Sequence, residues 1–192
     1  YDRRRQRQMC IRDRPRTLAI TYNGDMDLSI IDELPKNRPD IHTSFIEKEN
    51  LSTAFNFIRE KVEDGGQTII VYPLINESEK QDLSAAVESY EYLRDNIFPD
   101  LTVGLMHGKL EDENKNLEMK NFMKGDIDIL VSTTVVEVGI DNPNVNVMLI
   151  NNSERFGLSQ LHQLRGRVGR GTIESYCLLS VSYTHRRCRR RS

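Results

Sequence analysis

The chain has 192 residues, of which 38% are hydrophobic, and a formal net charge of −2, which suits one globular domain with its own core. No stretch approaches the roughly 18 to 20 apolar residues of a membrane-spanning helix, and no secretory leader opens the chain, so we expect neither a membrane protein nor an exported one. The three cysteines, Cys10, Cys177 and Cys188, lack the spacing of a metal site or a disulfide framework, which favours a reduced, cytoplasmic setting.

Arginines gather at the two ends of the chain, six within residues 1–14 and five within 186–191. Subtracting these eleven from the 27 basic residues leaves 16, and subtracting Asp2 and Asp13 from the 29 acidic residues leaves 27, so the interior 15–185 carries a net charge of −11. An acidic body matches DNA phosphates poorly, and we expect it to bind DNA weakly by itself. Because both ends change composition abruptly, we interpret residues 1–14 and 181–192 as non-native extensions rather than nucleic-acid-binding tails.

Residues 15–40 hold three prolines and two short apolar runs, which is typical of a connector. From residue 41 a regular alternation begins. Apolar residues at helical spacing predict a helix over 51–64, and the run QTIIVY predicts a buried strand over 67–72. The alternation continues with a helix over 80–97, a strand over 101–106, a helix over 111–124, strands over 127–132 and 145–150, a short helix over 158–168 and a strand over 175–180. Such alternation predicts an α/β fold over 41–180, a doubly wound parallel sheet with helices on both faces.

Ligands of such sheets bind beyond the carboxyl ends of the strands. The segments expected there are polar and comprise 73–79, 107–110, 133–144 and 151–157. We therefore expect the chemistry of this domain in these loops.

The strongest local signal is QLRGRVGR at 163–170. Gln163, Gly166, Arg167 and Arg170 have offsets of 0, 3, 4 and 7, which place them on one face of a helix. Two guanidiniums one turn apart form a fork that suits phosphate oxygens. The alternative interpretation is a solvated basic helix end.

A second signal is STTVVEVGID at 132–141, directly after a predicted strand. The hydroxyls of Thr133 and Thr134 can bind a phosphate, Gly139 permits a close backbone approach, and Asp141 can accept a hydrogen bond from a sugar hydroxyl. An ordinary capped turn is equally compatible with this pattern.

His107 and Gly108 end another predicted strand and can contact a phosphate, although a loop histidine is also common. Gly108-Lys109 imitates a P-loop, but the motif requires Gly at 103 and Ser or Thr at 110, where the chain has Val103 and Leu110. The chain thus offers arginines without a phosphate cradle, and a domain of this kind must work opposite a second one that holds the nucleotide. No metal-ligand set is predicted.

These motifs resemble those of superfamily 2 helicases, because QLRGRVGR fits the motif VI pattern QxxGRxxR and STTVVEVGID is similar to motif V. Together with PRTLA, SIIDELP, YPLINESE, MHGKL and SYCLL, the run at 154–171 closely resembles the bacterial RecG helicase family over about residues 15–179. The transcription-repair coupling factor shares the block around 155–170 and is one alternative. A non-catalytic anion-binding α/β module is the other.

The RecG resemblance implies a second RecA-like motor domain at 41–180, joined through the connector 15–40 to a first motor domain that is missing here. It implies ATP as cofactor, with Mg²⁺ held by that first domain. The implied partners are branched double-stranded DNA, such as stalled forks and Holliday junctions, and the first RecA-like domain of the same full-length chain. The implied setting is the bacterial cytoplasm, and the isolated fragment would be inactive.

The resemblance also implies roles for single residues. Arg167 and Arg170 would be catalytic and reach the ATP γ-phosphate. The nucleotide would also be contacted by Gln163, Gly139 and Asp141, and the DNA backbone would be faced by Thr133, Thr134, His107 and Gly108.

Overall fold

The computed structural model describes residues 40–73, 79–133, 142–171 and 173–182, all of which belong to the unit Asn37–Ser192. The expected extensions at the two ends fall outside the described residues, apart from Val181 and Ser182, and so does the connector, apart from Asp40. Among the helices of the described part, none combines the length and the apolar composition needed to cross a bilayer.

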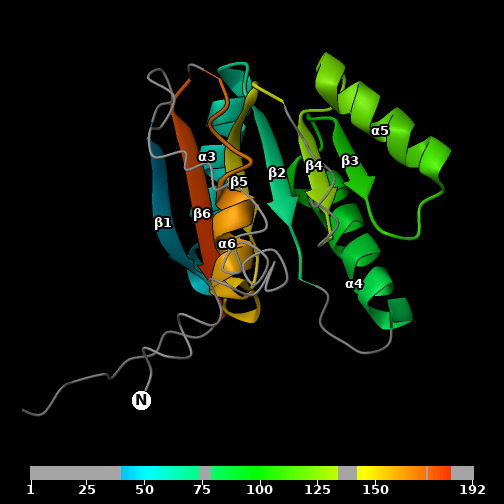
Figure 1. Cartoon of the computed structure of the whole chain (residues 1–192), viewed down its shortest axis with the longest axis horizontal. Coiled ribbons are helices and arrows are strands. Elements are labelled where there is room, and N and C mark those ends of the chain that lie inside the picture. The colour runs from blue at the N-terminus through cyan, green and yellow to red at the C-terminus, as the bar shows by residue number, and fades with distance from the viewer. Residues whose placement is uncertain (1–39, 74–78, 134–141, 172, 183–192) are drawn as a thin grey trace, which may run out of the picture. The chain divides into compact units, whose positions relative to one another are not determined.

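A single sheet of six strands forms the centre of the unit, in the order β1-β6-β5-β2-β4-β3 (Figure 1). Every pair of neighbouring strands runs parallel. The strands are β1 (Ile41–Glu47), β2 (Gln67–Val71), β3 (Val103–Met106), β4 (Ile129–Ser132), β5 (Val145–Ile150) and β6 (Ser175–Val181). The α-helices are α3 (Leu51–Glu63), α4 (Glu79–Tyr92), α5 (Asp112–Lys124) and α6 (Leu158–Arg165). Short turns of 3₁₀-helix form η1 (Lys48–Asn50) and η3 (Ser153–Arg155), and α4 continues into the π-helical turn η2 (Leu93–Ile97).

The sheet has one apolar core on each face because successive strand residues point to opposite sides. On β2, Ile69 and Val71 pack into the core beneath α5 and α6, whereas Ile70 packs into the core beneath α3 and η2. α5 contributes Phe122, which is fully buried, to the first of these cores. The predicted doubly wound parallel sheet with helices on both faces is therefore present (Figure 1).

The predicted strands and helices lie within a few residues of the observed ones, but β1 was not predicted. It is an edge strand that pairs only with β6, and the burial of its residues is low except at Ile41 and Ile46. A strand without a continuous buried face lacks the apolar alternation by which strands are recognised. Only the pairing with β6 makes this segment a strand.

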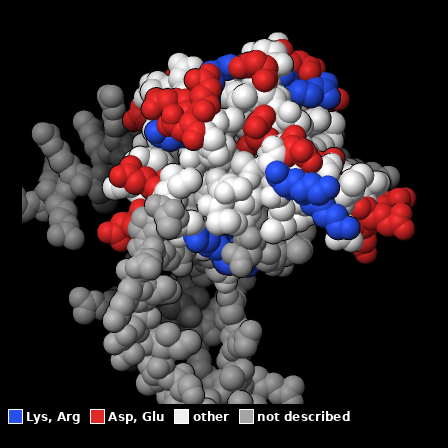
Figure 2. Space-filling view, turned by 90° about the horizontal axis from the view of Figure 1, so that it is seen from above, with Lys and Arg blue, Asp and Glu red and all other residues white. Residues whose placement is uncertain are grey.

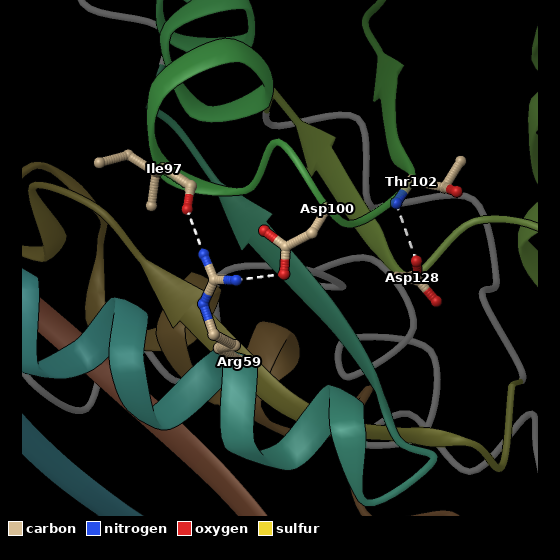
Figure 3. A network of polar contacts seen from close by, with 5 residues as sticks. All are labelled: Arg59, Ile97, Asp100, Thr102 and Asp128. Atoms are coloured by element: carbon tan, nitrogen blue, oxygen red, sulfur yellow. Dashed lines mark hydrogen bonds and ion pairs between the residues drawn. The ribbon is translucent and has the colours of Figure 1, made fainter.

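Arg59 joins helix α3 to the connection between η2 and β3 (Figure 3). One guanidinium nitrogen donates a hydrogen bond to the carbonyl of Ile97 at 2.6 Å, and another donates to the carboxylate of Asp100. The Arg59 hydrogen bond lowers the pKa of Asp100 below its ordinary value. At the start of β3, the Thr102 amide donates to Asp128 Oδ2 at 2.8 Å. These bonds keep β3, an edge strand of only four residues, in place.

Candidate functional site

The helix α6 carries the first part of QLRGRVGR and ends at Arg165. The predicted helix to residue 168 is therefore too long, and the helical face shared by Gln163, Gly166, Arg167 and Arg170 does not form. The amides of Arg167 and Val168 bond instead to the carbonyls three residues earlier, at 2.9 and 3.3 Å. A tightened last turn of this kind is common where a helix ends, and glycine is a poor helix former. The two arginines lie beyond the helix.

Two glycines fix the path of the chain after α6. Gly169 has a φ of 74°, in the left-handed region that favours glycine, and a Cβ there would lie 3.1 Å from the Ile41 side chain. A Cβ on Gly171 would lie only 2.4 Å from the carbonyl oxygen of Pro143. Ile41 begins β1, and Pro143 shortly precedes β5. The segment 169–171 therefore packs against the amino edge of the sheet.

This position separates the arginines from the loops in which we expected the chemistry. Arg170 is exposed and belongs to the segment 169–171 at the amino edge, whereas Arg167 is half-buried and precedes that segment. Gln163 is exposed near the end of α6. α6 runs back along the sheet from its carboxyl edge, and the chain after it continues towards the amino end of β6 (Figure 1).

Gly139 and Asp141, the other predicted nucleotide contacts, lie outside the described residues. The described chain resumes at Asn142, which is 2% exposed, and the next residue, Pro143, touches Gly171. The residues that follow the motif V-like and motif VI-like segments thus meet at the amino edge, although they are distant in sequence.

A buried amide cluster lies beside this meeting point, and it was not predicted. Gln67 Nε2 donates to the carbonyls of Phe122 and Ile127 at 2.7 and 2.6 Å, and Asn142 Nδ2 donates to Gln67 Oε1 at 2.9 Å. The amide of Asn144 donates to Asn142 Oδ1 at 3.0 Å. The only signal in the sequence was the glutamine that opens the apolar strand QTIIVY, and its partners are set by the tertiary structure.

His107, Gly108 and Thr133 come together at the opposite edge of the sheet. Met106 pairs with Ser132 at the ends of β3 and β4, so the residues that follow, His107 and Thr133, lie side by side. Thr133 is only 3% exposed, and its amide donates to the carbonyl of Met106 at 3.2 Å. The backbone amide of Thr133 therefore joins the two strand ends, while its side chain is buried. Thr134 lies outside the described residues.

His107 is half-buried, and its pKa is lowered by burial and then by the positive charges of Lys115 and Lys109. The imidazole is therefore neutral near pH 7, and its Nδ1 has no hydrogen-bond partner among the described residues. A neutral imidazole beside two lysines and the exposed Gly108 is a local arrangement that suits an anion such as a phosphate.

The face of the domain at the amino edge carries charges of both signs. The strands of Figure 1 point downward, so Figure 2, seen from above, shows the amino edge. Acidic side chains form several groups and basic side chains form separate patches, with uncharged surface between them (Figure 2). This distribution agrees with the net negative charge of residues 15–185.

Tyr72 directly follows β2 at the carboxyl edge, where its hydroxyl is hydrogen-bonded with Ser89 and Asn151. Burial raises the pKa of Tyr72 to about 12 from an ordinary value of 10.0. Because the pKa is higher in the folded state, this group contributes stability below pH 10 that is lost as the pH rises from about 10 towards 12.

We expect Tyr72→Phe to lower the free energy of unfolding by about 1 kcal/mol at pH 8, the typical net worth of a hydrogen bond. Between pH 9 and 11 the stability of the variant should fall less steeply than that of the wild type. Urea unfolding followed by circular dichroism measures both effects. Tyr92→Phe is the control, since Tyr92 is 57% exposed, and its curve should overlie the wild type. Parallel curves for the wild type and Tyr72→Phe would contradict the assignment.

Residues 49–172 match the family model described as the helicase conserved C-terminal domain. The chain belongs to this family. It is 53% identical over 167 residues to the ATP-dependent DNA helicase RecG of Thermotoga maritima, and the aligned region makes up 87% of this chain and 21% of that protein. A solved structure of RecG bound to a three-way DNA junction matches with a TM-score of 0.72 and 49% identity over 88% of this chain and 22% of that one. The predicted resemblance to RecG-type helicases is confirmed.

Domain 2 of the DEAD-box helicase Mss116p, solved with an RNA duplex, matches with a TM-score of 0.56 at 23% identity, over 74% of this chain and 55% of that one. At this identity the match supports the fold alone. The predicted RecA-like fold of a second helicase motor domain is confirmed. The chain spans about a fifth of the length of the Thermotoga maritima RecG protein.

Proposed function

We propose that this chain is the second motor domain of an ATP-dependent helicase that remodels branched DNA, such as stalled replication forks and Holliday junctions, in bacterial recombination and repair. The observation that carries the proposal is the arginine-bearing segment 167–170, whose end is held at the amino edge of a RecA-like sheet, in a sequence without a P-loop motif. The 53% identity to a RecG helicase supports branched DNA as the substrate, and the bacterial cytoplasm is where such DNA lies.

The residues at the amino edge fit the phosphates of ATP. Arg170 is exposed and Arg167 half-buried, so each can present a planar guanidinium to phosphate oxygens. The backbone is held in one path by Gly169, which lies between the two arginines, and by Gly171, which follows Arg170. ATP, bound with Mg²⁺ by the first RecA-like domain of the full-length chain, would supply the hydrolysable phosphate. The role proposed for this domain is to neutralise the charge that develops on that phosphate.

Contacts with the DNA backbone are proposed for His107 and Gly108 at the carboxyl edge. The neutral His107 lies close to Lys109 and Lys115, and such a corner can hold a backbone phosphate without reading base sequence. Because the two groups lie at opposite edges of one rigid sheet, movement of the domain against the first motor domain would move both together.

The resemblance to RecG favours this proposal over the two alternatives, a transcription-repair coupling translocase and a non-catalytic anion-binding module. It also implies that the 192-residue chain alone neither hydrolyses ATP nor unwinds DNA, since Lys109 does not belong to a P-loop. ATP turnover by the purified chain that disappears in Lys109→Ala would contradict this.

The direct test is a chimera in which residues 15–179 replace the matching segment of Thermotoga maritima RecG. We expect DNA-stimulated ATPase activity and unwinding of a three-way junction comparable with the parent. A chimera that folds, yet shows neither activity, would reject the motor-domain proposal and favour the anion-binding module.

A further inference from the structure

The turn before β5 is held by the buried amide cluster. Asn142 Oδ1 accepts the Asn144 amide at 3.0 Å, and the Val145 amide donates to the carbonyl of Asn142 at 3.3 Å. These two bonds close a turn around Pro143 and fix the direction of its carbonyl group. That carbonyl is the group that approaches Gly171.

Gln67 anchors this turn to the rest of the domain. Its side chain is 5% exposed and donates both amide hydrogens, one to the Phe122 carbonyl in α5 and one to the Ile127 carbonyl before β4, while its oxygen accepts from Asn142 at 2.9 Å. The Gln67 amide also donates to the carbonyl of Asn144 at 2.9 Å. A buried amide with every group satisfied is rigid, since each lost bond leaves a polar group without a partner in the interior.

Because the turn contacts Gly171, it also restrains the backbone of residues 169–171, which include Arg170. There is no room for a side chain at Gly171, so the backbone next to Arg170 lies directly against the Pro143 carbonyl. On the other side, Gly169 packs against Ile41 of β1. Arg170 thus projects from a backbone that is braced at both neighbouring residues.

We propose that Gln67 and Asn142 are positioning residues that set the place of the Arg170 guanidinium through the Pro143 carbonyl and Gly171. The proposal rests on the proposed function, because it takes Arg170 as the residue that acts on the nucleotide. Neither amide touches the nucleotide in this scheme. Their effect on activity must therefore pass through Arg170.

The test uses the chimera with T. maritima RecG and the substitution Gln67→Met, which keeps the length of the side chain and removes its hydrogen bonds. We expect kcat of the DNA-stimulated ATPase to fall about ten- to hundredfold, because a displacement near 1 Å of a reacting group has costs of this size. Asn142→Asp is a second variant: its carboxylate still accepts from Asn144, but in a buried site it sets an acceptor against Gln67 Oε1 in place of the donor. We expect a loss of at least the same size in the same direction.

Thr68→Val is the matched control. Thr68 is the next residue of β2, it is fully buried, and its hydroxyl has no hydrogen-bond partner among the described residues. All activities are expressed per folded molecule, measured from the circular dichroism of each preparation. Thr68→Val should leave kcat within about twofold of the parent chimera, as expected for a change outside the network.

The deciding measurement is Gln67→Met combined with Arg170→Ala. If Gln67 acts through Arg170, the double variant has the kcat of Arg170→Ala alone. If the two losses multiply, Gln67 has a general structural role and the inference is overturned. An Arg170→Ala variant with unchanged kcat would instead reject the proposed function, so the two failures are distinguishable.

Discussion

Arg170→Ala in the chimera is expected to lower the DNA-stimulated kcat for ATP by a hundredfold or more. Arginines that neutralise a transferring phosphoryl group contribute on the order of 10³ to 10⁵ in rate, and Arg170 is the exposed arginine at the end of the braced segment. The KM for DNA should change little, since the predicted DNA contacts lie at the other edge of the sheet. Steady-state ATPase assays over a range of ATP and DNA concentrations separate the two effects.

Two further variants sharpen this result. Arg170→Lys keeps the charge but loses the planar fork, so we expect it to recover only a small part of the lost rate. Arg165→Ala removes another exposed arginine of the same motif, from the last residue of α6, and should stay within about twofold of the parent, as is usual for surface substitutions. Equal losses for Arg165→Ala and Arg170→Ala would show that only the positive charge of the region matters.

Phe122→Ala should lower the free energy of unfolding of the 192-residue chain by about 3 to 5 kcal/mol, the usual cost of removing a buried aromatic ring. Phe122 is fully buried in the core beneath α5 and α6, and its carbonyl accepts the Gln67 side chain at 2.7 Å. The cavity would therefore loosen both the helix and the amide cluster. Urea denaturation followed by circular dichroism measures the change.

Leu117→Ala on the same helix is the matched control because Leu117 is 55% exposed. Its cost should stay within about 0.5 kcal/mol, as for most surface positions. Similar losses for Phe122→Ala and Leu117→Ala would mean that α5 does not pack on the sheet through Phe122.

Periodicity in the sequence was sufficient to predict the class of fold. Buried parallel strands form uninterrupted apolar runs, as in IIV at 69–71, and helices show a stripe of apolar residues, as in α3. The edge strand β1 was missed because it is covered on neither face along most of its length. A strand of this kind exists only because β6 offers its hydrogen-bonding edge.

Residue types and their spacing also predicted that Arg167 and Arg170 bind phosphate, but not where in the fold they lie. Treating QLRGRVGR as one helix placed Gln163, Arg167 and Arg170 on a shared face, whereas α6 ends at Arg165. The end of a helix depends on the contacts of the residues that follow it. Here Gly169 turns against Ile41, a residue far away in the sequence.

The sequence by itself thus determined the parallel α/β fold, the family resemblance and the arginine-rich motif, because these follow from local periodicity and from the order of residues. Only the tertiary structure decided that the arginine segment lies at the amino edge, that Pro143 meets Gly171, and that Gln67 and Asn142 bond to each other. The physical reason is that each of these contacts joins segments distant along the chain, and a buried amide or a glycine acquires its partner only when the sheet brings those segments together.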